Sequence, residues 1–409
     1  MTTDRTTDFG IVGAGPAGLA LALALVRSGA RVTVIEKSRS FERDFRGEIL
    51  QPGGLAVLDQ LGVLAGARRR GDHRHDRFQL RQRDRALLDI DYGRLPEPYN
   101  YLLSIPQQHV LAELLAQCRA YEGFEYVEGT RVTGLIEKDG AVVGLQADGN
   151  LGAITVRAHC VIGADGRFSK VRRLANIDTV RIDLFDFDVL WFKLPGGPPS
   201  SATPQVQIFR DSGNPTIVYR SWPDRVQVGW TLPHRGYQEV ARRGIEAVKA
   251  EIARAIPPYA EQVHAGIRTL GDLSLLDVFA GGAQTWVKDG LVLIGDAAHT
   301  HSPLGAQGIN LALQDAALLH PVLIAALRTG DASADLLRQY QDPRRADIDR
   351  VMRMQVMQAK GMISQGGLAD RIRPRIATLI GRTPIGARIT RQIAFGPRDV
   401  HVQQQLFTA

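Results

Sequence analysis

The chain has 409 residues, of which 44% are hydrophobic and 23% charged, and it carries a net charge of +7. This composition is typical of a soluble globular protein with more than one lobe, and it excludes extended disorder. The mild positive charge is not gathered into the basic stripe that marks nucleic-acid-binding proteins. The two cysteines lack the spacing of a disulfide framework or a metal site, which predicts no metal and a reducing, cytoplasmic setting.

An apolar run at residues 9–26 opens the chain, and it is long enough to resemble a signal peptide or a membrane span. It contains four glycines and a proline, however, and it leads directly into a β-rich run at 31–36. We therefore interpret residues 8–13 as a buried strand, 16–28 as an apolar helix and 31–36 as a second strand. This β-α-β order predicts a parallel sheet with a right-handed crossover and no stable membrane insertion.

The rest of the chain alternates between helical and strand periodicity, and near residue 178 the pattern changes to strand periodicity alone. From 178 to 233, short alternating runs are separated by proline and glycine, which predicts an antiparallel sheet. An amphipathic helix over 237–256 follows and is ended by two prolines. The other expected helices are 52–66, 107–121, 307–328 and 333–364, and the other expected strands lie in 76–92 and near 125–135, 141–147, 153–163 and 290–294.

Both ends of the chain are therefore expected to build one α/β lobe, with a β-rich lobe inserted between them. The seam between two lobes is a common place for a ligand cleft. We assign residues 1–71, 101–177 and 276–345 to the first lobe, 72–100 and 178–275 to the inserted lobe, and 346–409 to a C-terminal helical segment.

The first chemical motif lies where the first predicted strand turns into the first helix. Gly13 permits a tight turn, Gly15 lets the backbone approach a pyrophosphate, and Gly18 lets helix and strand pack closely. The helix N-terminus offers free N–H groups to phosphates, and Glu36 at the end of the second strand can accept hydrogen bonds from ribose. The motif predicts a dinucleotide site rather than a chance glycine turn, with contacts from Gly13, Ala14, Gly15, Ala17, Gly18, Glu36 and Lys37.

Two later blocks separate FAD from NAD, which the first motif alone leaves open. One reads DGRFSKVR over residues 165–172, and the other reads GDAAHTHSPLGAQGIN over 295–310. With the first motif, and in this order, they resemble the single-component aromatic-hydroxylase family of FAD-dependent monooxygenases. The resemblance covers about residues 8–350 and is loose only in the inserted lobe. It implies a p-hydroxybenzoate-hydroxylase-like fold, with a Rossmann-type, glutathione-reductase-like FAD-binding domain, an inserted antiparallel-sheet substrate domain and C-terminal helices.

The third block also has a physical logic of its own. A strand ends just before Asp296, whose carboxylate can accept hydrogen bonds from the ribityl chain of a flavin. Around Pro303 the backbone can approach a flat ring, and the N–H groups of the following helix start stabilise negative charge. The alternative is a surface glycine turn before a helix. We expect flavin contacts from Asp296, Pro303, Gly305, Gly308, Ile309 and Asn310, and the resemblance implies that Pro303 also positions the ring.

The resemblance implies further FAD contacts, one residue at a time. Arg46 matches the arginine of the family's second loop, near the moving flavin ring. Gln108 matches a Gln or Arg near the ribityl–phosphate region, although Gln107 lies beside it. Val132 matches the backbone that meets adenine, and Asp165 matches an aspartate near the pyrophosphate that the family also ties to nicotinamide use. The ordinary alternatives are a solvated charge for Arg46, a helix cap for Gln108 and a core residue for Val132.

His299 and His301 lie in the third block and invite a metal or acid–base role. An H-x-H pair with no acidic or cysteine partner nearby in the sequence is weak evidence for a metal. We therefore expect a packing or hydrogen-bonding role for His299.

The resemblance implies a monooxygenase cycle. NADPH or NADH visits transiently and reduces the flavin, O₂ adds to give a flavin C4a-hydroperoxide, and an oxygen atom passes to an electron-rich carbon. The expected function is hydroxylation or epoxidation of a small aromatic or polyketide-like substrate. The alternatives are an FAD-dependent reductase or dehydrogenase of the same fold, a flavin-dependent halogenase, whose W-x-W-x-I-P segment is absent, and a flavin-binding protein without turnover.

The substrate is expected between the flavin and the inserted sheet. Side chains alternate along a strand, so about half of any set of strand residues faces away from the substrate. The possible lining residues are Gln207, Phe209, Tyr219, Arg220, Trp222, Gln227 and Trp230, of which we expect substrate contacts from Gln207, Tyr219 and Trp222. The aromatic side chains favour a flat or apolar substrate. An Arg-rich stretch at 371–382 predicts a basic amphipathic helix that packs on its own protein rather than on a membrane.

Overall fold

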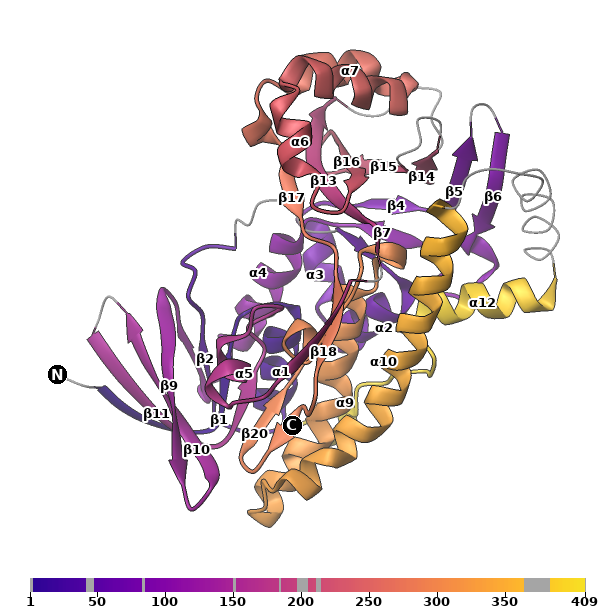
Figure 1. Ribbon diagram of the computed structural model, residues 1–409. Helices are drawn as coiled ribbons and strands as arrows, with labels where there is room; N and C mark the ends of the chain where they lie inside the picture. Colours follow the sequence, from indigo (N-terminus) through magenta and orange to yellow (C-terminus); the bar gives the residue numbers. More distant parts are fainter. Residues whose placement is uncertain are drawn as a thin grey trace.

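The structure is a computed structural model that describes residues 3–41, 48–82, 85–149, 152–183, 185–196, 205–210, 215–363 and 383–408. Two large sheets organise it (Figure 1). One sheet carries the N-terminal strand, and the other lies in the upper part of the view beneath α6 (Tyr237–Arg242) and α7 (Ile245–Ala255). The long helix α10 (Ala334–Ile363) runs from beside the first sheet toward the second.

The first sheet has eight strands and contains the predicted β-α-β unit. The path β20-β11-β1-β2-β8 is parallel throughout. Helix α1 (Pro16–Arg27) connects β1 to β2. Because it is apolar on all sides, it must be buried on all sides. Helices α4 (Gln107–Cys118) and α9 (Gly308–Thr329) pack against it. The predicted strand–helix–strand start is confirmed. The strands are β1 (Thr3–Val12), β2 (Val32–Ile35), β8 (Phe124–Val127), β9 (Thr130–Lys138), β10 (Ala141–Gly149), β11 (Gly152–Gly163), β19 (Val287–Lys288) and β20 (Leu291–Leu293).

The single strand expected near 125–135 is two strands in the structure. β8 pairs in parallel with β2, whereas β9 pairs antiparallel with β10 and so belongs to a different edge of the sheet. The alternating pattern continues across the break, because strand periodicity carries no information about which neighbour a strand pairs with. The sequence therefore showed strand character but not the change of partner.

Two predicted helices are also divided. The helix expected over 52–66 is α2 (Pro52–Gln60) followed by α3 (Leu64–Arg69), and the amphipathic helix that precedes the two prolines is α6 followed by α7. Gly62 and Gly244 lie at the breaks with φ of +64° and +80°, a left-handed conformation that interrupts a right-handed helix. Apolar spacing continues across both breaks, so it did not reveal them.

The second sheet has seven strands in the order β17-β13-β16-β15-β14-β5-β6. Its neighbouring pairs are antiparallel except β14 and β5, which are parallel. The prediction of antiparallel pairing over 178–233 is confirmed for the strands within that range. The parallel pair arises where β14 meets β5, which comes from a segment far earlier in the chain, so its direction is set by tertiary pairing. The strands are β5 (Arg77–Gln82), β6 (Arg85–Asp91), β13 (Phe187–Pro195), β14 (Gln205–Phe209), β15 (Thr216–Ser221), β16 (Arg225–Pro233) and β17 (Ser274–Leu276).

Smaller elements connect the two sheets. Two three-stranded sheets have the orders β12-β18-β21 and β3-β7-β4. Their strands are β3 (Ile49–Leu50), β4 (His73–His75), β7 (Leu102–Ser104), β12 (Thr179–Ile182), β18 (Ala280–Ala283) and β21 (His299–Thr300). The short helices are α5 (Lys170–Leu174), α8 (Ala260–Gly266), η1 (Tyr92–Arg94), η2 (Pro257–Tyr259), η3 (Leu270–Asp272), η4 (Gly295–Ala297), η5 (Leu304–Ala306) and η6 (Gln404–Leu406).

The expected helices at 307–328 and 333–364 are confirmed as α9 and α10, and α12 (Pro384–Phe395) follows later in the chain. The basic amphipathic helix predicted at 371–382 lies outside the described residues. Among the described residues, one segment, Leu304–Thr329, is long and apolar enough to cross a membrane, with a mean hydropathy of 1.4. Since 72% of its most apolar window is buried inside the molecule, it also fits a core helix.

The two faces of the seven-stranded sheet bury different side chains. On one face, Val218 and Trp230 pack with residues of α7 and α8. On the other face, Val189, Trp191 and Tyr219 gather toward the first lobe. This second face therefore lies at the junction of the two lobes.

Candidate active site

One cavity of about 1540 Å³ runs through the junction. Its lining begins at the turn between β1 and α1, includes the ends of β2 and β20 and the start of β9, and continues to the inner face of the seven-stranded sheet. An ordinary small-molecule pocket measures roughly 300–1,000 Å³, so this cavity has room for more than one such ligand.

The glycine-rich turn forms one end of the cavity. Gly13, Gly15 and Ala17 line it. A Cβ on Gly15 would meet nothing within 4 Å, whereas a Cβ on Gly18 would lie 2.0 Å from the carbonyl oxygen of Gly13. Gly18 therefore serves close packing of helix and strand, and Gly15 leaves open space beside the N-terminus of α1. This arrangement fits an elongated group with phosphates at that terminus.

Glu36 and Lys37 line the same end of the cavity. The Glu36 carboxylate is 4% exposed and accepts hydrogen bonds from the backbone N–H groups of Ala14, at 2.8 Å, and Ser38, at 2.9 Å. These bonds hold the carboxylate in one orientation at the tip of β2. Ala14 thus acts through its N–H group and does not itself line the cavity.

Val132 and Asp165, both expected near FAD, also line the cavity. The Asp165 carboxylate accepts a hydrogen bond from the Ser169 hydroxyl, at 2.5 Å, and from the backbone N–H groups of Lys170, at 2.6 Å, and Val171, at 3.1 Å. Its first role is therefore to cap the start of α5 and fix the shape of the cavity wall.

The third sequence block forms the middle of the cavity. Asp296, Pro303, Gly305, Gly308 and Ile309 line it, and a Cβ on Gly308 would meet nothing within 4 Å. Such open glycine surface fits the close approach of a flat ring to the backbone.

Asn310 does not line this cavity, contrary to expectation. Its side-chain oxygen accepts a hydrogen bond from the Gln51 backbone N–H at 2.9 Å, and its Nδ2 donates to the Ala306 carbonyl at 2.5 Å. Asn310 therefore holds two loops together at the start of α9.

A buried network behind the third block joins it to α10. His299 Nε2 lies 2.8 Å from the Asp315 carboxylate, and His299 Nδ1 lies 3.0 Å from His301 Nε2. Arg344 Nε donates to the other Asp315 oxygen at 2.7 Å. Burial by itself raises the pKa of Asp315, but the charges and hydrogen bonds of His299 and Arg344 outweigh it and lower the pKa to about 2. The expected hydrogen-bonding role of His299 is confirmed.

Gln108 and Arg46 were both predicted near the flavin. Gln107 lines the cavity, whereas Gln108 is exposed and does not, so the neighbouring glutamine is the better candidate. On α4 the two side chains point about 100° apart, and sequence periodicity does not choose between them. Arg46 lies outside the described residues.

The inner sheet face shows which strand residues reach the cavity. Val206, Ile208, Ile217 and Tyr219 line it, and Gln207 does not. The expected Gln207 contact is therefore wrong, because alternation turns its side chain away from the face that Val206 and Ile208 share. The candidate contact of Tyr219 remains.

Trp222 is also wrong as a cavity residue. It follows β15 and does not line the cavity, and its ring packs edge-on against His109 with a centroid separation of 5.0 Å. Trp230 and Phe209 belong to the core on the opposite side of the sheet. The aromatic lining at this end comes instead from Phe187, Trp191 and Tyr219.

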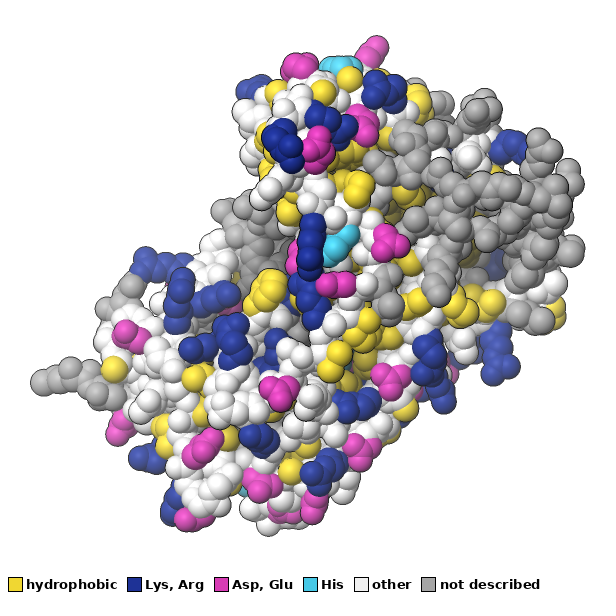
Figure 2. Space-filling model, viewed as in Figure 1, with side chains coloured by type: hydrophobic (Ala, Val, Ile, Leu, Met, Phe, Trp, Pro, Cys, Tyr) yellow, Lys and Arg dark blue, Asp and Glu magenta, His cyan; other side chains and the backbone are white. Residues whose placement is uncertain are grey.

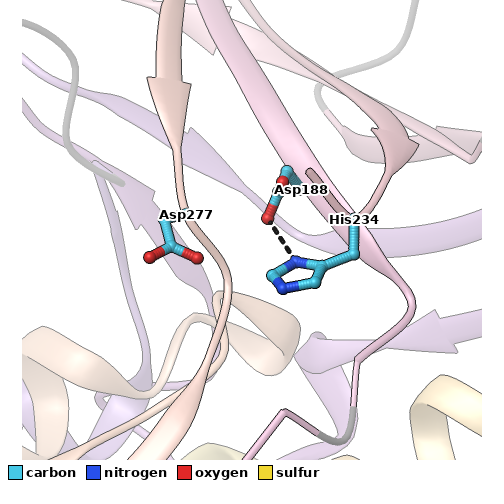
Figure 3. A group of neighbouring side chains, drawn as sticks. All are labelled: Asp188, His234 and Asp277. Carbon is cyan, nitrogen blue, oxygen red and sulfur yellow. Dashed lines mark hydrogen bonds and ion pairs between the residues drawn. The ribbon is translucent and has the colours of Figure 1, made fainter. Parts of the chain in front are cut away.

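One cluster of described residues, Asp188, His234 and Asp277, has spacing that could hold a metal ion (Figure 3). Hydrogen bonds and ion pairs already engage its carboxylates. Asp188 accepts from His234 Nδ1 at 2.9 Å and from the backbone N–H of Arg235 at 2.7 Å. Asp277 pairs through both oxygens with Arg181, at 2.8 and 3.0 Å. The cluster is therefore explained as a structural ion-pair network near the cavity.

Among the cavity residues that sequence reasoning missed are Gln51 and Tyr92, which hydrogen-bond to each other. Gln51 directly precedes Pro52 at the start of α2, so a helix-start signal was present. Its long-range partners were not visible in the sequence, because they come from two distant segments, one at Tyr92 and one at the third block.

Comparisons with known proteins agree with this architecture. The family model described as FAD binding domain matches residues 6–355. A 6-methylpretetramide 4-monooxygenase from Streptomyces rimosus is 54% identical over 401 residues, covering 98% of this chain and 95% of that protein. A 12-dehydrotetracycline 5-monooxygenase/anhydrotetracycline 6-monooxygenase from Streptomyces rimosus subsp. rimosus is 30% identical over 85% of this chain and 68% of its own length.

Solved structures show the same fold. A p-nitrophenol 4-monooxygenase from Pseudomonas putida DLL-E4 matches with a TM-score of 0.83 and 22% identity, covering 96% of this chain and 100% of that one. An anhydrotetracycline hydroxylase from Streptomyces rimosus matches with a TM-score of 0.75 and 24% identity, covering 95% of this chain and 76% of that one. The predicted FAD cofactor and monooxygenase class are confirmed, and the reductase alternative is not favoured. The chain belongs to the aromatic-hydroxylase-like family of FAD-dependent monooxygenases.

Proposed function

We propose that this monooxygenase hydroxylates a polycyclic aromatic polyketide, using O₂ and a nicotinamide reductant. The observation that carries the proposal is the apolar inner face of the seven-stranded sheet, which lines a cavity too large for one ordinary ligand. The 54% identity to a 6-methylpretetramide 4-monooxygenase supports a substrate of the same class.

The proposed FAD site follows the cavity from the α1 N-terminus to the third block. Glu36 accepts hydrogen bonds from ribose, the α1 N–H groups meet the pyrophosphate, and the backbone around Pro303 and Gly308 faces the ring. When bound, FAD supplies the reductive activation of O₂. The protein's own residues bind and orient the reactants and exclude water from the junction.

In this proposal the two lobes divide the work. Segments 1–71, 101–177 and 276–345 hold FAD, segments 72–100 and 178–275 bind the substrate, and 346–409 closes one side of the cavity through α12. Gly386, Ile389 and Ile393 of α12 line the cavity, which supports that closing role.

The reductant is proposed to approach from the face shown in Figure 2, where Lys and Arg side chains gather over β9, β2 and α5. Arg131, Lys170 and Arg173 line the cavity and form no ion pair with a described residue. Phe168 lies nearby at the cavity, with 64% of its surface exposed. Unpaired cations beside an exposed aromatic ring suit an anionic nicotinamide dinucleotide.

The reductant site is testable at Lys170 and Arg173. We expect the double change Lys170→Glu and Arg173→Glu to raise the KM for NADPH by about tenfold or more, because two attractive charges become repulsive. Anaerobic stopped-flow reduction measures the effect. Enzyme reduced chemically with dithionite serves as the control and should hydroxylate as wild type does. A slow reaction after chemical reduction would contradict a role confined to the reductant.

The function itself is tested on purified FAD-loaded enzyme. Polycyclic aromatic polyketides should accelerate NADPH oxidation and oxygen consumption, and ¹⁸O₂ should label the product. p-Nitrophenol, with one ring, is the matched small substrate and should stimulate less. Product formation under argon would overturn the proposal.

A further inference from the structure

Gln51 is a buried side chain that touches both halves of the cavity. It lies just before α2, lines the cavity and is only 3% exposed. Its Nε2 donates to the Gly305 carbonyl at 2.9 Å, and its Oε1 accepts from the Tyr92 hydroxyl at 3.1 Å. Its backbone N–H donates to Asn310 Oδ1, also at 2.9 Å. One residue thus joins the inserted lobe to the loop of the third block.

The orientation of the Gln51 amide is determined by its partners. A backbone carbonyl can only accept a hydrogen bond, so Nε2 must face Gly305 and Oε1 must face Tyr92. Burial raises the pKa of Tyr92 to about 12, so its hydroxyl keeps its proton and remains a donor at working pH. Along the two hydrogen bonds, Tyr92 therefore donates to Gln51 and Gln51 donates to Gly305.

The Gly305 carbonyl is held at two points. Gln307 Nε2 also donates to it, at 3.0 Å, and the same Nε2 donates to the Ile393 carbonyl of α12, at 2.8 Å. Gly305 itself has a φ of +72°, a conformation that side-chain-bearing residues rarely adopt. These contacts fix which way the peptide groups of this cavity-lining loop point.

Tyr92 occupies the other end of the chain. It begins η1, directly after β6 of the seven-stranded sheet, and lines the cavity. It is packed in the same buried cluster as Ile49, Val189 and Trp191 on the inner sheet face. A substrate that fills this end of the cavity presses on the cluster that holds the Tyr92 ring.

We propose that Gln51 is a positioning residue that couples occupancy of the substrate end to the placement of the flavin-facing loop, through the hydrogen bonds Tyr92–Gln51–Gly305. The inference rests on the proposed function, because it takes the inner sheet face as the substrate end. A filled substrate end holds Tyr92 and Gln51 in place, and Gly305 then presents the loop to the flavin ring. The two bonds restrain the loop in substrate-free enzyme, and a filled substrate end strengthens that restraint.

The experiment uses FAD-loaded enzyme and three variants. Tyr92→Phe removes only the first hydrogen bond, and Gln51→Leu removes both side-chain bonds. Tyr99→Phe is the matched control, because its hydroxyl donates to Asp59 at 2.6 Å and it does not line the cavity. The first measurement is iodide quenching of flavin fluorescence without substrate. We expect stronger quenching in Tyr92→Phe and Gln51→Leu than in wild type and Tyr99→Phe.

The second measurement is hydrogen peroxide formed per NADPH at saturating substrate. Loss of one buried hydrogen bond corresponds to about tenfold, so we expect the peroxide fraction to rise by up to that factor in both cavity variants. A residue that only contacts substrate would raise KM and leave the peroxide fraction at saturation unchanged, and that result would overturn the proposal. Wild-type quenching in both variants would also overturn it.

Two further outcomes are separable. If Gln51→Leu does not fold, Tyr92→Phe decides, because it leaves every other Gln51 contact in place. If wild-type enzyme oxidises no polycyclic substrate, the proposed function fails, while the substrate-free quenching still tests the connection between Tyr92 and the flavin-facing loop.

Discussion

Two glycines of the β1–α1 turn, Gly15 and Gly18, are required for different reasons. A methyl group on Gly18 would overlap the Gly13 carbonyl, whereas the same group on Gly15 would meet no protein atom. The chain's own packing therefore constrains Gly18, and the proposed pyrophosphate constrains Gly15.

This difference predicts opposite behaviour of two alanine variants. We expect Gly15→Ala to unfold at the same urea concentration as wild type when both lack FAD, but to bind FAD about tenfold or more weakly, because the added methyl group narrows the approach to the pyrophosphate. Gly18→Ala should lower the stability of the FAD-free protein by about 1–3 kcal/mol, since backbone must move. Urea denaturation and FAD titration measure both. Wild-type FAD affinity in Gly15→Ala would contradict the proposed site.

Asp315 is a second residue whose contribution to the free energy of unfolding can be predicted. It is fully buried between His299 and Arg344, and removing its charge leaves the buried Arg344 guanidinium with only the longer ion pair to Asp347, at 4.0 Å. We expect Asp315→Asn to lower the free energy of unfolding by about 3–5 kcal/mol. Denaturant unfolding at pH 7 checks this, with Asp349→Asn at an exposed position of α10 as control. A loss under about 1 kcal/mol would show that the network is not stabilising.

At the scale of elements, one face of the seven-stranded sheet lines the cavity and the other packs against helices. In β15, Ile217 lines the cavity and Val218 lies in the core formed with α7 and α8. Helices α6 to α8 therefore seal one face and leave the other for the cavity. The division follows from strand alternation once the helix-covered face is known.

Adjacent substitutions in β15 should separate binding from stability. We expect Ile217→Asn to raise the substrate KM by about tenfold with little change in stability, because it removes apolar contact in the cavity. Val218→Asn should instead lower the free energy of unfolding by about 2–4 kcal/mol by burying an unpaired amide. Steady-state kinetics and urea denaturation of both variants give the comparison. If both variants raised KM equally, the assignment of Ile217 to the cavity face and Val218 to the core face would be wrong.

At the scale of the whole molecule, three buried histidines make stability depend on pH, and burial lowers the pKa of one of them, His301, well below its ordinary value. Burial lowers the pKa of His75 and of His320 to about 4, from an ordinary value near 6.5. Between these values the unfolded chain binds more protons than the folded one, so stability is complete above about pH 6.5 and is lost as pH falls toward 4.

The slope of this loss is predicted. Each histidine should remove up to about 1.4 kcal/mol per pH unit below pH 6.5. Urea denaturation at pH 7, 6 and 5 measures the slope, and His320→Gln should remove the share that belongs to His320. An unchanged slope in that variant would show that His320 does not titrate as its burial indicates.

The sequence indicated the cofactor through three local motifs, and it indicated the reaction class through the family resemblance that these motifs carry. Each places glycines, a carboxylate or a helix start within a few residues, and backbone conformation over that distance follows from residue type. The β-α-β start, α9 and α10 were predictable for the same reason, since their apolar periodicity is strong and uninterrupted.

Only the tertiary structure decided which side chains lie together at the cavity. Periodicity cannot state which face of a sheet is covered, so Gln207 and Trp222 were expected at the cavity while Ile217 was not. The parallel pairing of β14 with β5 and the contacts of Gln51 join segments far apart in the chain, and only the packed fold brings such segments within hydrogen-bonding distance. The sequence therefore identified the chemistry, and the tertiary structure assigned the residues that position it.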